Sequence, residues 1–288
     1  MAAQPHMDRA SAVARILANN GDLAALPQVV FKVMEITGTD PACAVALERA
    51  IVVDPGFSAK LLALANSAHF ALPKKVSSIK DAIMFIGLRQ VRQTAMAVGV
   101  FDMFLGKSDS ESRRRRAWWR HSVDSATAAK ALAKDYDVDE NSAYTAGLLH
   151  WFGRTVLDKS NPGAYEKVIQ LQDRGVPFWQ AEEAVFGCDH RDIAMASAAS
   201  WGFPDELVNG LAYYRRPDDH PEDNRLGALV AIGGVIADVA LTGRIRNDGS
   251  AKALPDWVLP HLGISDEQTD KIIEKGLAAI TAGSHLHF

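Results

Sequence analysis

Residues 78–105 read SIKDAIMFIGLRQVRQTAMAVGVFDMFL, and this stretch indicates the fold class. Its apolar residues recur every three or four positions, the spacing that places side chains on one face of an α-helix. Ser78, followed by Asp81 three residues later, is a typical N-terminal cap for that helix. We therefore predict one helix with a buried stripe, formed by Ile79, Ile83, Ile86, Val91, Thr94, Ala95, Val98, Phe101 and Leu105.

Helical periodicity continues along the rest of the chain. It predicts further helices over residues 57–65, 123–133, 143–157, 189–200, 205–214 and 226–241. Repeated alternation of apolar and polar residues, which would indicate strands, is scarce. The helix count and the short Gly, Pro and Asn breaks predict an all-α protein built as a two-lobed helical bundle.

A change of composition divides the chain. Residues 106–116 read GKSDSESRRRR and contain no apolar side chain, which is typical of a junction between structural units. We expect a first helical lobe over residues 1–106 and a second over residues 112–288. A change of lobe angle about this junction is a candidate mechanism, and small-angle scattering with and without a partner would test it.

The chain is mildly acidic, with 31 Lys and Arg against 35 Asp and Glu and a formal net charge of −4. A general nucleic-acid binder needs an excess of basic residues, so nucleic acid is not an expected partner. Cys43 and Cys188 have no metal-ligand spacing, which predicts reduced thiols. The sequence offers neither a signal peptide pattern nor an unbroken run of about 18 apolar residues, which predicts a cytoplasmic protein away from the membrane.

Several motif residues are predicted to be structural, as Ser78 is. Asp54 and Pro55 suit the first turn of a helix, where the missing N–H of proline costs nothing. Asn66 and Ser67 end that helix, and their side chains can bond nearby backbone or fix a neighbouring segment. Gly87 costs a helix about 1 kcal/mol relative to Ala, which predicts that another backbone passes close to it.

The run Arg113, Arg114, Arg115 and Arg116 precedes two tryptophans and forms a candidate interaction patch. Such a run could bind phosphate and stack on bases, or it could bind an acidic protein. The alternative is a solvated linker that enters a helix whose indoles pack inward.

A set of short motifs follows a fixed order along the chain: Leu26-Pro27, Asp40-Pro41, Asp54-Pro55, LANSA at 64–68, SSI at 77–79, GLR at 87–89 and GLLH at 147–150. Taken together, these motifs resemble the HDOD domain, a degenerate relative of the HD superfamily of metal-dependent phosphohydrolases. The resemblance covers residues 20–240 and implies an all-helical fold with an HD-like second half and a role in bacterial signal transduction.

The resemblance also implies where a relic of the HD site would lie. His121 matches the first His, His150 the His of the His-Asp pair, and His190 a later His. Trp151 replaces the paired Asp. Tyr213 and Tyr214 stand where a His-His pair is usual, and Asp238 matches the late Asp. The relic pocket, which could bind a ligand, is His121, His150, Trp151, His190, Tyr213, Tyr214 and Asp238.

Trp151 determines whether we expect metal binding and catalysis. A bridging carboxylate supplies the negative charge that holds metal ions, and the metal makes water a nucleophile. An indole has no lone pair suited to ligation, so we expect neither a metal, a cofactor nor catalysis. The leading hypothesis is a signalling regulator that binds a histidine kinase, a response regulator or another regulatory protein, in a two-component or cyclic-nucleotide pathway. The alternatives are a residual metal-dependent phosphohydrolase or phosphodiesterase, weak metal binding by the imidazoles, and a nucleotide sensor that uses the relic pocket.

Overall fold

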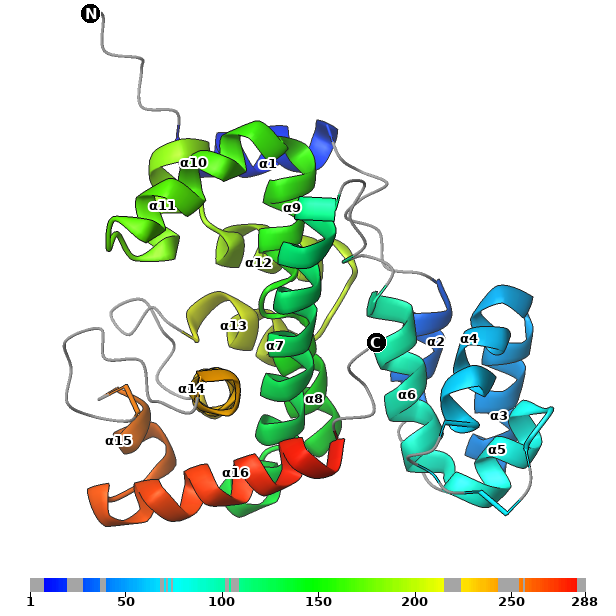
Figure 1. The fold of residues 1–288 in the computed structure, drawn as a ribbon. Coiled ribbons are helices and arrows are strands. Elements are labelled where there is room, and N and C mark those ends of the chain that lie inside the picture. Colours follow the sequence, from blue (N-terminus) through cyan, green and yellow to red (C-terminus); the bar gives the residue numbers. More distant parts are fainter. Residues whose placement is uncertain are drawn as a thin grey trace, which may run out of the picture.

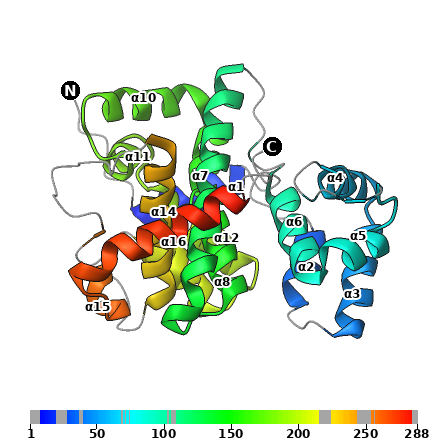
Figure 2. The same cartoon turned by 60° about the horizontal axis from the view of Figure 1, so that its bottom comes forward.

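The computed structural model describes residues 8–19, 28–36, 40–67, 70, 72–73, 75–101, 104, 109–214, 224–242, 254–255 and 257–283. These residues form helices and no strands, so the predicted all-α class is confirmed. Figure 1 shows a small helical lobe beside a larger one that is built around the long helix α7. The same two bodies are visible from below in Figure 2.

The smaller lobe consists of five helices that pack around one another. It contains α2 (Gln28–Glu35), α3 (Pro41–Val52), α4 (Pro55–Ala65), α5 (Ile79–Ile86) and α6 (Leu88–Phe101).

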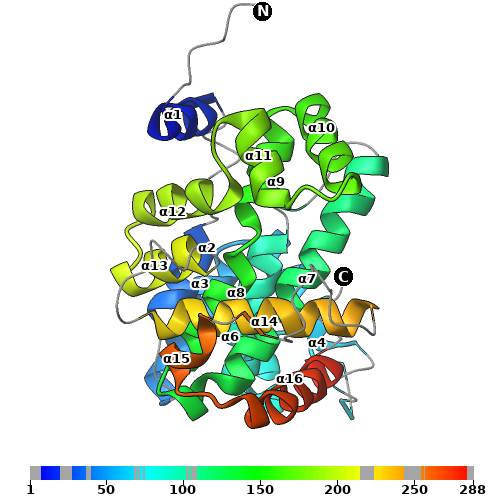
Figure 3. The ribbon, with the colours of Figure 1, turned by 90° about the vertical axis from the view of Figure 1, so that its left-hand side faces the viewer.

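The larger lobe contains the remaining helices, with α14 crossing α7 (Figure 3). Its helices are α1 (Arg9–Asn19), α7 (Asp109–Ala133), α8 (Glu140–Leu149), α9 (Phe152–Ser160), α10 (Pro162–Asp173), α11 (Phe178–Phe186), α12 (His190–Ser200), α13 (Asp205–Tyr213), α14 (Arg225–Thr242), α15 (Val258–Leu262) and α16 (Thr269–Gly283).

Helix α14 is the one described helix whose length and composition would suit a membrane span. In this fold 61% of that stretch is buried inside the protein, against α7, α8, α13, α15 and α16. The apolar surface of α14 is therefore buried mostly in the core of the larger lobe.

The helix caps of the smaller lobe form as the sequence indicates. The Asp54 side chain accepts a hydrogen bond from the amide of Phe57, and Pro55 occupies the first turn of α4. The Asn66 side chain bonds both backbone groups of Val76, at 2.8 and 2.7 Å, and so fixes the path of the segment before α5. The Ser67 hydroxyl makes no hydrogen bond within the part of the chain described here.

The prediction of one helix from Ile79 onward is wrong. Ser78 caps α5 through the amide of Asp81, but the chain breaks at Gly87, whose φ is +87°, and α6 starts afresh. The predicted close approach of a backbone to Gly87 is also wrong, because a Cβ placed there would meet nothing within 4 Å. Gly87 is required by its backbone angle, which L-residues rarely adopt. Leu105, the end of the predicted stripe, lies outside the described residues.

The predicted helix over residues 143–157 is also two helices, since α8 ends at Leu149 and α9 begins at Phe152. His150 and Trp151 occupy the break. This break turns both side chains toward the centre of the larger lobe, where they are buried.

The expected lobe boundaries need two changes. Helix α1 lies within residues 1–106 but packs on α9 and α12 of the larger lobe. Helix α7 already begins at Asp109, inside the segment expected to be a junction, so the arginine run is helical. Of that segment, residues 106–108 lie outside the described residues.

Candidate functional site

Most of the predicted relic-pocket residues do meet in the core of the larger lobe. The His121 ring from α7 stacks on the Trp151 indole, with centroids 3.6 Å apart and planes at 13°. His150 lies 5.3 Å from both the His121 ring and the Tyr214 ring. We call His121, His150, Trp151, His190 and Tyr214 the histidine cluster. Each of its side chains is at least 92% buried.

The other two predicted members take smaller parts. Asp238 on α14 reaches the edge of the cluster, where its Oδ1 lies 3.4 Å from Nδ1 of His121. Tyr213 is only half-buried, and the hydrogen bond from this pair of tyrosines to His190 comes from Tyr214. The sequence therefore identified the tyrosine pair, and the structure shows that Tyr214 rather than Tyr213 contacts His190.

Two close helix contacts set the cluster in place. A Cβ on Gly147 would lie 2.5 Å from Cα of Ala126, so glycine allows α8 to press against α7. A Cβ on Gly153 would collide with the carbonyl oxygen of His190. His150 is further fixed by a 2.6 Å hydrogen bond between Nδ1 and the carbonyl oxygen of Gly147. Because a carbonyl oxygen only accepts, His150 carries a proton on Nδ1.

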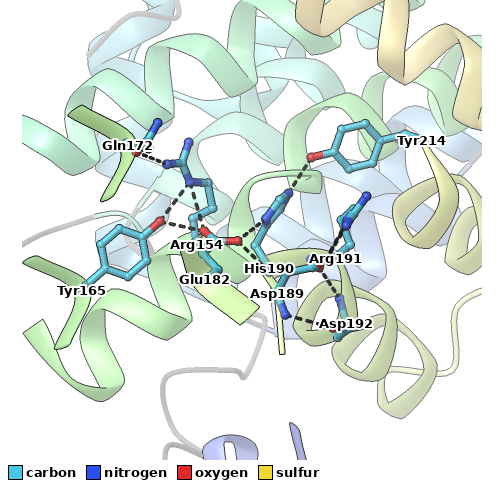
Figure 4. A network of polar contacts seen from close by, with 9 residues as sticks. All are labelled: Arg154, Tyr165, Gln172, Glu182, Asp189, His190, Arg191, Asp192 and Tyr214. Atoms are coloured by element: carbon cyan, nitrogen blue, oxygen red, sulfur yellow. Dashed lines mark hydrogen bonds and ion pairs between the residues drawn. The ribbon is translucent and has the colours of Figure 1, made fainter. Parts of the chain in front are cut away.

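His190 is bonded at both ring nitrogens. Its Nδ1 lies 2.5 Å from Oε2 of Glu182, which also accepts the backbone N–H of His190 at 3.0 Å. Its Nε2 lies 2.7 Å from the hydroxyl of Tyr214. Asp189 caps the same helix in a capping box with Asp192, which fixes the start of α12. Figure 4 shows the polar network from Glu182 through His190 to Tyr214, with the cap of Asp189 and Asp192 beside it.

A buried arginine completes this network. The Arg154 guanidinium lies 3.4 Å from Oε1 of Glu182 and donates to the Tyr165 hydroxyl, which in turn donates to Glu182 at 2.8 Å. Its Cζ also lies 4.5 Å from the centroid of the Trp151 ring and 4.7 Å from that of Phe178. Arginine above an aromatic face is a favourable cation–π arrangement.

The charges of this network stabilise one another. Burial alone would raise the pKa of Glu182, but His190 and Arg154 outweigh burial and lower that pKa below its usual value. Burial likewise opposes the charge of Arg154, yet Tyr165 and Glu182 raise its pKa. Burial raises the pKa of the Tyr165 hydroxyl well above its usual value, so this hydroxyl stays protonated and can donate.

The residues of this site do not fit the metal centre that the resemblance to HD phosphohydrolases implies. Within the described part of the chain, no group of three or more His, Cys, Asp or Glu side chains is arranged to hold a metal ion. Trp151 stands where the resemblance implies a carboxylate, and the Arg154 cation lies against its ring. A second cation beside that guanidinium would be repelled.

The predicted four-arginine patch is wrong for two of its members. Arg115 is 1% exposed, and its Nε lies 2.6 Å from Oδ2 of the buried Asp158. Arg114 binds the other oxygen of Asp158, also at 2.6 Å. Only Arg113 and Arg116 are exposed. The two tryptophans that follow are buried, as the alternative interpretation expected.

Sequence reasoning missed Glu182, Arg154 and Tyr165, which form the polar network at the histidine cluster. It also missed Asp158, which binds Arg114 and Arg115. One signal could have identified Glu182. It lies four residues after Phe178 and four before the buried Phe186, so it shares their helix face. A carboxylate at a core position indicates a buried partner.

Comparison with known proteins gives a family and several related folds. A family model described as the HDOD domain matches residues 23–217. An uncharacterised protein of Treponema pallidum (strain Nichols) is 27% identical over 211 residues, which are 69% of this chain. This chain spans 39% of the length of that relative.

Three solved structures are similar over almost the whole chain. An HDOD domain protein of unknown function from Geobacter sulfurreducens has 22% identity and a TM-score of 0.71, covering 95% of this chain and 98% of that one. A protein from Shewanella amazonensis SB2B, provisionally named a phosphohydrolase, has 21% identity and a TM-score of 0.70, covering 95% of this chain and 98% of that one. A protein from Marinobacter aquaeolei VT8, provisionally named a signal transduction protein, has 22% identity and a TM-score of 0.72, covering 96% of this chain and 64% of that one.

Proposed function

Because this chain belongs to the HDOD domain family, we propose that it is a non-catalytic signalling regulator that acts in the cytoplasm by binding a partner protein. The partner is a histidine kinase, a response regulator or another regulatory protein of a two-component or cyclic-nucleotide pathway. The provisional name of the Marinobacter protein, which shares the fold, is in keeping with a role in signalling.

One observation carries the non-catalytic part of this proposal. The Trp151 indole stacks on His121, and the Arg154 guanidinium lies on the same indole. The space in which a hydrolytic metal would have to bind is thus filled by an aromatic ring and a fixed cation. Hydrolysis of this class needs a metal with an open position for water. The histidine cluster is better suited to holding α7, α8, α12 and α13 together.

The smaller lobe offers a surface for a partner. Large apolar side chains are exposed on α3, at Val53 directly after it, and on α5, and the two helices pack against each other. Exposed apolar side chains favour protein–protein contact when a partner covers them. We call this surface the α3–α5 face, and its exposed fractions are 48% for Val45, 55% for Val52, 73% for Val53, 68% for Met84 and 39% for Phe85.

Partner capture with matched surface variants tests the interaction. Wild-type protein, a Val53→Asp/Met84→Asp double variant and a Leu241→Asp control would be immobilised and exposed to native cell extract, followed by mass spectrometry. Leu241 is also exposed, at 54%, but lies on α14 of the larger lobe. We expect one signalling protein to be retained by wild type and control and lost by the double variant. Equal retention by all three would contradict docking at the α3–α5 face.

A separate assay tests the absence of catalysis. Purified wild-type protein would be analysed for bound metal and incubated with a generic phosphodiester and manganese. We expect no turnover above background. Stoichiometric metal with turnover that is abolished by His150→Ala would establish the enzyme alternative instead.

A further inference from the structure

A cavity lies between the two lobes, away from the histidine cluster. Its volume is about 380 Å³, within the range of small-molecule sites. The smaller lobe contributes residues of α2 and α6, and the larger lobe contributes α7, α8 and the turn between α12 and α13. Figure 1 shows α2 and α6 on the side of the smaller lobe that faces α7 and α8. None of the histidine-cluster residues lines this cavity.

One wall of the cavity is aromatic. Phe31 of α2 meets two rings from the turn after α12, with its centroid 6.5 Å from that of Trp201 and 6.0 Å from that of Phe203. These two rings are themselves 5.3 Å apart. All three residues line the cavity, so a planar ring placed there would meet aromatic surface from both lobes.

The cavity also contains two cations whose bonds go to neutral groups. Arg92 is 7% exposed, and its guanidinium donates to the carbonyl of Ile36 and to Oδ1 of Asn141. The Lys130 ammonium donates to Oε1 of Gln93 at 2.6 Å. Among the described residues, no carboxylate forms an ion pair with either cation. Burial lowers the pKa of both, with Asp139 opposing this at Arg92 and Glu140 at Lys130.

The carboxylates nearest to the two cations bind groups other than Arg92 and Lys130. Asp139 caps α8 and accepts the amides of residues 141 and 142. Glu140 lies 3.3 Å from Nζ of Lys134 and 4.0 Å from Nη1 of Arg89. The other carboxylates that line the cavity are exposed to solvent, namely Glu35 and Glu206.

We propose that this interlobe cavity binds a small aromatic anion, with its ring against Phe31, Trp201 and Phe203 and its anionic group at Arg92 and Lys130. A buried charge without an opposite charge is costly, and an anionic ligand would supply that charge to both residues at once. An aromatic ring would use the remaining apolar wall. The two requirements together select a ligand that carries both groups.

Such a ligand would stabilise one arrangement of the two lobes. Arg92 and Gln93 belong to α6, while their partners Asn141 and Lys130 belong to α8 and α7. The bonds of the two cations therefore join the lobes directly. A ligand held by both lobes favours the arrangement in which both contact it. This binding is independent of the proposed docking at the α3–α5 face, so either can fail alone.

Thermal-shift measurements followed by titration calorimetry test the site. The probes are 5′-AMP, 5′-GMP and indole-3-acetate as aromatic anions, guanosine as a ring without charge, and inorganic phosphate as a charge without a ring. We expect at least one aromatic anion to raise the melting temperature, and guanosine and phosphate to have much smaller effects. A response to nucleotides alone would identify the anion as a phosphate, and a response to indole-3-acetate alone would identify it as a carboxylate.

Matched lysine variants locate the binding. Lys130→Met should lower the affinity for the active probe about 10- to 100-fold, because a charged hydrogen bond is lost. The same change should alter the stability of the unliganded protein only slightly, because Lys130 is half-buried and its hydrogen bond goes to the neutral Gln93. The control is Lys167→Met, an equal substitution at an exposed position of α10, and it should bind as wild type does. The absence of a shift with every aromatic anion at millimolar concentration, or equal affinity in Lys130→Met and wild type, would overturn the proposal.

Discussion

The substitution Glu182→Gln tests the buried network most directly. Glu182 is 0% exposed, and its carboxylate contacts His190 at two atoms, Tyr165 at 2.8 Å and Arg154 at 3.4 Å. Glutamine keeps the shape of the side chain but removes the negative charge. Arg154 would then be a buried cation without a counter-charge. Removing one partner of a buried ion pair typically costs about 3–5 kcal/mol, and we expect a loss of that size in the free energy of unfolding.

The loss should depend on pH in a defined direction. The folded-state pKa of Glu182 lies below its usual value of 4.5, so its charge stabilises the fold above that pH. This contribution is lost as the pH falls through the lowered folded-state pKa. Urea unfolding of both proteins at pH 7 and in steps below pH 4.5 would therefore show the stability difference shrinking with acid.

A double substitution provides the control. Arg154→Met together with Glu182→Gln removes both charges, and a neutral pair of similar volume costs much less than a broken ion pair. The double variant should therefore be more stable than the sum of the two single effects predicts. Strict additivity of the two losses, or a Glu182→Gln loss below about 1 kcal/mol at pH 7, would refute the view of this network as a coupled ion pair.

Four further changes have expected outcomes. Asn66→Ala should cost about 1–3 kcal/mol in urea unfolding, because both backbone groups of Val76 lose their partner. Gly87→Ala should cost on the order of 1–3 kcal/mol by the same assay, because its φ of +87° with ψ of 151° strains any other residue. Asp158→Asn should lower stability far more than removal of the exposed Arg113, since two arginines lose a buried partner. Trp151→Asp should bind no stoichiometric manganese by metal analysis, because Arg154 remains as a competing cation in the site.

The parts of the fold that the sequence predicted depend on local contacts. The caps at Asp54 and Ser78 bond backbone groups three residues away, so the motif contains both partners. The break at Gly87 was missed because the apolar spacing of α5 continues into α6 with little change of phase. Only the backbone angle distinguishes two helices from one, and a glycine is compatible with both.

The parts of the site that the sequence did not predict depend on distant partners. The positions of His121, His150 and His190 came from the resemblance to a known family. Glu182 was missed because its partners come from three other elements, at Arg154, Tyr165 and His190. The arginine run was predicted to be an interaction patch because Asp158, which binds Arg114 and Arg115, lies some 43 positions away from Arg115 in the sequence. Neither pairing has a periodic signature.

The Arg154 guanidinium contacts both the buried Glu182 and Trp151, which stands where the resemblance implies a carboxylate. A buried Glu182 requires positive charge nearby, because an uncompensated carboxylate in the core costs several kcal/mol. In a metal centre of the type that the resemblance implies, a bound ion would supply positive charge. Here Arg154 supplies it, and the ring of Trp151, 4.5 Å from its Cζ, stabilises the cation through its face. A guanidinium has no open coordination position at which water could become a nucleophile, whereas a bound metal ion would offer one.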